Sequence, residues 1–122
     1  MAIRRPGALH KQVLDFYLKS EGWRVTAIDQ RVAALELDLV AEKDSGLKEY
    51  LVVQCVDGQT VSAKDVARFA AKASAFRRQL PPIAWWDERP PVTAVLAHTG
   101  AVPPELEAQA RLAEAPVQFR RF

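Results

Sequence analysis

The sequence predicts a mixed α/β domain, in which a mixed β-sheet is flanked by helices in the order αβββαβ, followed by a C-terminal helix and a candidate last strand. Two long stretches carry apolar residues at helical spacing, and short stretches between and after them are rich in β-branched and apolar residues. A hairpin followed by a helix and another strand gives a sheet with antiparallel and parallel pairs. The length of 122 residues suits a single domain over 1–122.

The first half of the chain is predicted to form a helix and three strands. Residues 8–20 have an apolar stripe at helical spacing, and Gly22 follows at a position where a left-handed cap is easiest for glycine. Turn-forming residues at 44–46 predict a hairpin between the second and third strands. The three strands are expected at about 23–28, 33–42 and 49–56.

The second half is predicted to start with the longest helix, over residues 62–80. Ser62 followed three residues later by Asp65 resembles a capping pair at its start. Residues 92–97 form a nearly continuous apolar run, which is typical of a strand covered on both faces. A shorter helix is expected over about 103–113 and a last strand near 117–119.

The composition excludes several classes of protein. At 49% hydrophobic and 26% charged residues the chain is globular, and the lone Cys55 cannot form an internal disulfide. No apolar stretch reaches the roughly 20 residues that span a bilayer, and Arg4 and Arg5 precede no signal-peptide core. We therefore expect a cytoplasmic protein with no membrane partner. The net charge of +2 permits a polyanionic partner without requiring one.

Acidic and apolar residues alternate along the second expected strand. Glu36 and Asp38 are two residues apart, and carboxylates on one strand face could share a divalent cation. The alternative is a half-buried strand with a solvated acidic face. The alternation predicts that Leu35, Leu37, Leu39 and Ala41 face one way, and Glu36, Asp38, Val40 and Glu42 the other.

A polar residue, Gln54, interrupts the third expected strand. An unpaired buried amide costs about 1–3 kcal/mol, so Gln54 needs a partner. In an ordinary core the partner is a backbone group or a hydroxyl, and in a functional site it is a metal-bound water or the acidic strand. The alternation turns Cys55 away from Asp38, so we expect no thiol nucleophile there.

Four segments within residues 8–80 resemble a known family: EGWRV, LELDLV, YLVVQCV and SAKDVARFAAKA. They are similar to the Mrr-type branch of the PD-(D/E)xK nucleases. The resemblance implies the restriction-endonuclease-like fold, DNA as the partner and Mg²⁺ or Mn²⁺ as the cofactor, and it leaves a homodimer open. It also implies that Asp38 is the metal-binding aspartate and that Gln54 takes the first position of the family's Glu-x-Lys or Gln-x-Lys pair.

The chain departs from the family pattern at two places. Val56 occupies the position of the catalytic lysine, and a valine can neither polarise a phosphate nor position water. Residues 10–12 contain no acid where the family often has a glutamate. A lysine on another element could replace the missing ammonium, and Lys64 is the candidate. Together with Arg68 and Lys72 it forms a basic helical stripe that either contacts phosphates or is an ordinary solvated face.

Three functions therefore remain open. The first is a DNA-binding protein with a degenerate metal-dependent phosphodiesterase site around Asp38 and Gln54. The second is an active endonuclease in which Asp38, with Glu36 or Gln54, holds Mg²⁺ or Mn²⁺ and Lys64 supplies the ammonium. The third is a non-catalytic interaction or assembly subunit that uses its helix faces and the loop containing Trp85 and Trp86.

Overall fold

The computed structural model describes residues 8–20, 22–32, 35–45, 47–58, 60–81, 90–111 and 116–122, without the side chains of residues 29–32, 35, 36, 45 and 47. Each predicted helix and strand is present, with boundaries shifted by a few residues. The elements are α1 (Ala8–Lys19), β1 (Arg24–Val32), β2 (Leu35–Ser45), β3 (Leu47–Val56), α2 (Ala63–Gln79), β4 (Val92–His98), α3 (Pro104–Arg111) and β5 (Val117–Arg121). Trp85 and Trp86 lie outside the described residues.

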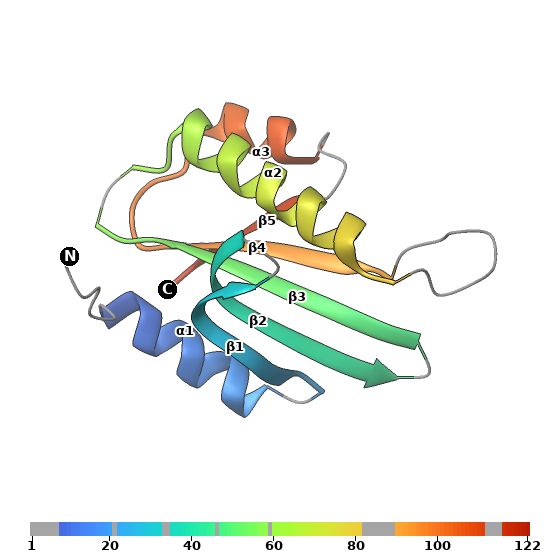
Figure 1. Ribbon diagram of the computed structural model, residues 1–122. Helices are drawn as coiled ribbons and strands as arrows, with labels where there is room; N and C mark the ends of the chain where they lie inside the picture. Colours follow the sequence, from blue (N-terminus) through green and yellow to red (C-terminus); the bar gives the residue numbers. More distant parts are fainter. Residues whose placement is uncertain are drawn as a thin grey trace.

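The described strands form a five-stranded sheet in the order β1-β2-β3-β4-β5 (Figure 1). The pairs β1–β2 and β2–β3 are antiparallel, and the pairs β3–β4 and β4–β5 are parallel. The predicted hairpin joins β2 to β3, where Ser45 pairs with Leu47. The mixed α/β class predicted from the sequence is confirmed.

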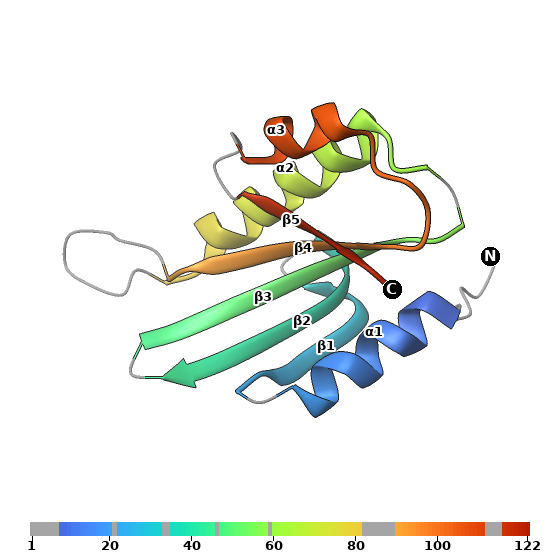
Figure 2. The ribbon, with the colours of Figure 1, turned by 180° about the vertical axis from the view of Figure 1, so that it is seen from behind.

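Helices cover both faces of this sheet. Helix α1 packs on one face, and α2 and α3 pack on the opposite face (Figures 1 and 2). Strand β4 is covered on both sides, as its apolar run predicts: Ala94 and Leu96 join the core under α2, and Val95 and Ala97 join the core under α1. None of the helices in the described part of the chain is long and apolar enough to cross a membrane.

Helix α2 begins where the sequence predicts. The Ser62 hydroxyl accepts the Asp65 N–H at 3.1 Å, and the Asp65 carboxylate accepts the Ser62 N–H at 3.0 Å, which completes a capping box. Gly22 has a φ of +90°, the left-handed conformation expected just after α1. These two features set where α2 begins and where the chain turns after α1.

The predicted alternation along β2 is wrong around Asp38. Leu37 packs in the core under α2, whereas Leu39 packs in the core under α1, so the two do not share a face. The change of face falls where one strand pairing ends. The register between β2 and β3 ends at Leu39, opposite Val53, so Asp38 lies where β2 leaves β3, while β2 stays paired with β1 as far as Leu35.

Candidate metal and nucleic-acid site

Asp38 is buried at the point where β2 leaves β3, with 5% of its surface exposed. Its Oδ2 accepts the backbone N–H of Cys55 at 2.7 Å, in the place that a strand carbonyl would otherwise take. Its Oδ1 lies 3.4 Å from Nε2 of His10 on α1. The carboxylate therefore links β2, β3 and α1 at one end of the sheet.

His10 is the functional candidate that sequence reasoning missed. Its side chain is 17% exposed, and both ring nitrogens are buried without a hydrogen-bond partner among the described residues. A signal was present in the sequence, because His10 stands three residues before Val13 and seven before Tyr17, on the buried stripe of α1. It also falls in the 10–12 stretch where the family resemblance implies an acid.

Cys55 lies beside Asp38, and the prediction that it points away is wrong. One ligand atom each from His10, Asp38 and Cys55 lie within 4.8 Å of one another, so the three could hold a divalent cation. Nitrogen and sulfur donors suit zinc-like ions, whereas Mg²⁺ and Mn²⁺ prefer oxygen. This donor set does not fit Mg²⁺ or Mn²⁺. The side chain of Glu36, the other expected acid, lies outside the described residues.

Gln54 lines a cavity of about 390 Å³ next to this group. Its Oε1 is buried and has no hydrogen-bond partner within the described ranges. The described residues therefore do not supply the partner that a buried amide oxygen needs. A water or a ligand in the cavity could supply it. We call this space the Gln54 cavity, and it is lined by His10, Gln54, Cys55, Val56, Asp57, Asp65, Arg68, Phe69 and Lys72.

Only two of the three residues of the predicted basic stripe line the Gln54 cavity. Arg68 and Lys72 on α2 line it, whereas Lys64 is exposed on the first turn of α2 and is not among its lining residues. Val56 is 7% exposed and packs with Val61 and the other apolar residues under α2. The cations that border the cavity therefore come from α2.

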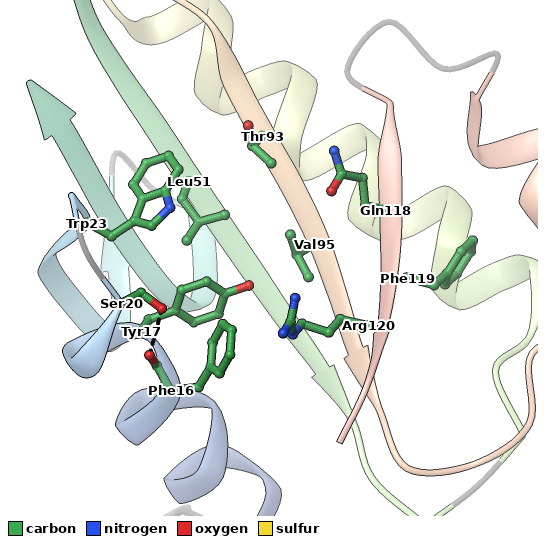
Figure 3. Close-up of a pocket in the computed structure, with 10 residues that line it drawn as sticks. All are labelled: Phe16, Tyr17, Ser20, Trp23, Leu51, Thr93, Val95, Gln118, Phe119 and Arg120. Atoms are coloured by element: carbon green, nitrogen blue, oxygen red, sulfur yellow. Dashed lines mark hydrogen bonds between the residues drawn. The ribbon is translucent and has the colours of Figure 1, made fainter. Parts of the chain in front are cut away.

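A second cavity, of about 330 Å³, opens on the α1 side of the sheet (Figure 3). The Tyr17 side chain points toward Arg120 across it, and the Arg120 guanidinium carbon lies 4.0 Å from the centre of the Phe16 ring. Burial raises the pKa of the Tyr17 hydroxyl, and the positive charge of Arg120 partly opposes this. None of these residues is among the site residues that the sequence predicts.

The Tyr17 pKa predicts how stability changes in alkali. Above about pH 10 the unfolded tyrosine ionises while the folded one keeps its proton. The native state then binds more protons, so the free energy of unfolding falls as pH rises toward and through the folded pKa. We expect Tyr17→Phe to flatten this decline in urea denaturation series above about pH 10. Parallel pH dependences in the two proteins would contradict the prediction.

The element order, the mixed sheet and the two helical layers define the class: the chain has the restriction-endonuclease-like fold. It resembles the crystal structure of a repair endonuclease from Pyrococcus abyssi, with a TM-score of 0.65 and 10% identity over 99% of this chain and 49% of that one. It resembles an EndoMS–dsDNA complex with a TM-score of 0.65 and 9% identity, over 100% of this chain and 47% of that one.

A third structure, the MspJI restriction endonuclease in complex with a 27-mer oligonucleotide, has a TM-score of 0.58 and 17% identity over 93% of this chain and 24% of that one. The chain thus spans half or less of each of these proteins. At these identities the likeness concerns the fold. No family model matches the sequence, and no curated protein matches it.

Proposed function

We propose that this chain binds DNA through a nuclease-type domain over residues 1–122 whose phosphodiesterase site, around Asp38 and Gln54, is degenerate. The observation that carries the proposal is the environment of Val56, the position that the Mrr-type resemblance gives to the catalytic lysine. Val56 is buried in the apolar core and forms part of the wall of the Gln54 cavity. At this position the cavity is therefore lined by an apolar side chain and not by an ammonium group. A valine cannot stabilise the negative charge that develops on a phosphate during cleavage.

The cations beside the Gln54 cavity support DNA as the ligand. Arg68 and Lys72 lie one helical turn apart on α2 and line the cavity, and Lys64 extends the same stripe by one turn toward the helix start. Cations at this spacing can contact successive phosphates without reading sequence. Two of the structures with a similar fold are described as complexes with DNA or an oligonucleotide.

The buried Oε1 of Gln54, which has no hydrogen-bond partner among the described residues, favours a second candidate, an active endonuclease. This Oε1 and the Asp38 carboxylate are oxygen donors, and Glu36 could add another. In this alternative these oxygens bind Mg²⁺ or Mn²⁺, and a lysine of α2 such as Lys64 replaces the missing ammonium. The N, O and S donors of the described side chains around Asp38 disfavour this candidate.

The test measures binding and cutting in one preparation. We expect a fluorescent DNA duplex in EDTA to bind with an affinity that falls steeply with salt, equally for wild type and Asp38→Asn. We expect no cutting of plasmid or single-stranded DNA with Mg²⁺ or Mn²⁺. Cutting by the wild type that is lost in Asp38→Asn would establish the endonuclease instead. Absent DNA binding together with a stable oligomer in sedimentation would establish an assembly subunit.

A further inference from the structure

We infer that His10, Asp38 and Cys55 form a binding site for a zinc-class divalent cation, one that accepts nitrogen and sulfur ligands. The inference concerns these three side chains and does not rest on DNA binding. The Mrr-type resemblance implies an oxygen-ligand site for Mg²⁺ or Mn²⁺, whereas two of the three donors here are an imidazole nitrogen and a thiol sulfur.

The spacing of the three donors is close to that of a coordination sphere. Ligand atoms bound tetrahedrally at about 2.0–2.3 Å from a zinc ion lie roughly 3.5 Å from one another. The Oδ1 of Asp38 and Nε2 of His10 are already 3.4 Å apart, and all three donors lie within 4.8 Å of one another. Small side-chain rotations therefore suffice to bring the Cys55 sulfur to bonding distance.

The imidazole of His10 is available for a cation. Both nitrogens of His10 are buried and have no hydrogen-bond partner in the part of the chain that the structure describes. A cation would give one of them a partner. The Oδ2 of Asp38 accepts the Cys55 N–H, which fixes the carboxylate and leaves Oδ1 directed toward His10.

The Gln54 cavity gives the cation a route into the site. His10 and Cys55 both line it, so an ion can reach their donor atoms without unfolding of the helix. Three protein ligands leave a fourth position for a water or a substrate atom, as in open zinc sites. When the sulfur–metal bond forms, the thiol releases its proton to solvent.

Cobalt(II) tests this site directly, because it replaces zinc in such sites and gives visible spectra. Cys55 is the only cysteine of the chain, so a thiolate-to-cobalt charge-transfer band can come from no other residue. We expect metal-free, reduced wild type to develop this band on titration with Co²⁺, and excess Zn²⁺ to bleach it. We expect a large excess of Mg²⁺ to leave it unchanged. We also expect Zn²⁺ to raise the melting temperature of the wild type.

Three variants identify the ligands. Cys55→Ser should abolish the charge-transfer band, and Cys55→Ser, His10→Ala and Asp38→Asn should each lower Zn²⁺ affinity by about 100-fold or more in competition with a chromogenic chelator. Asp15→Asn, an exposed acid on α1, is the matched control and should bind Zn²⁺ as the wild type does. A wild type without the band, Zn²⁺ affinity that survives Cys55→Ser and His10→Ala, or displacement of Co²⁺ by Mg²⁺ would each overturn the inference. These measurements contain no DNA, so their failure is separate from a failure of DNA binding.

Discussion

Asp38→Ala is expected to lower the free energy of unfolding by about 1–3 kcal/mol more than Asp38→Asn does. Both substitutions remove a buried negative charge, so both variants gain the same stability from no longer burying that charge. They differ in the acceptor atom and in side-chain volume. An asparagine oxygen can still accept the Cys55 N–H, whereas alanine leaves that buried donor without its 2.7 Å partner. The difference between the two variants therefore measures the lost acceptor together with the volume that alanine removes.

Urea denaturation of the metal-free protein, followed by tryptophan fluorescence and circular dichroism, measures this difference. The same pair of substitutions at Asp15 is the control, because Asp15 is exposed and makes a surface ion pair with Lys19. We expect Asp15→Ala to be the more stable of this pair, by up to about 0.7 kcal/mol of helix propensity, which is opposite in sign to the difference expected at Asp38. Equal stabilities of Asp38→Ala and Asp38→Asn would mean that the carboxylate does not hold the end of β2 against β3.

The same bond decides how a nuclease assay should be designed. Loss of cutting in Asp38→Ala could follow from disordering of the strand end, because the alanine variant removes a ligand and a structural acceptor together. Asp38→Asn keeps the acceptor and removes the charge on which a metal-bound mechanism depends. Asparagine is therefore the substitution that separates chemistry from folding at this position.

The features that the sequence predicted correctly are those set by neighbouring residues. The capping box of Ser62 and Asp65, the hairpin between β2 and β3 and the double-sided burial of β4 each depend on a short stretch of chain. Binary patterning and turn chemistry act over that range, so they can be read without knowing the tertiary structure.

The site was harder to predict because it depends on where strands separate and where helices lie. Strict alternation assumed a regular β2, so it placed Cys55 away from Asp38, whereas the two are hydrogen-bonded where the β2–β3 pairing ends. The helical period of α2 predicted that Lys64, Arg68 and Lys72 share a stripe. The docking of α2 on the sheet decides which residues of that stripe border the Gln54 cavity. Helical periodicity does not determine this docking.

Reversing two charges of this stripe should have the largest effect on DNA binding. Near 0.1 M salt, each phosphate contact contributes about tenfold to affinity through counterion release. We expect the double variant Arg68→Glu, Lys72→Glu to weaken duplex binding by about 100-fold or more, and the slope of log affinity against log salt to become shallower by about 2. Fluorescence anisotropy over a salt series measures both quantities.

A change in net charge alone would also weaken binding, so the control must carry the same charge. The double variant Lys19→Glu, Lys48→Glu reverses two exposed cations that lie outside the Gln54 cavity. The new glutamates face Asp15 and Glu42, so circular dichroism must first show that this variant is folded at the assay temperature. If the α2 stripe binds phosphate, this control keeps most of the wild-type affinity and salt slope. If both double variants lose affinity equally, attraction is spread over the surface and the α2 stripe is not the DNA-binding face. If the control keeps its affinity, Lys64→Glu tests how far the DNA-binding face extends, because Lys64 continues the stripe beyond the cavity. A shallower salt slope in this variant would show that the contact reaches the first turn of α2.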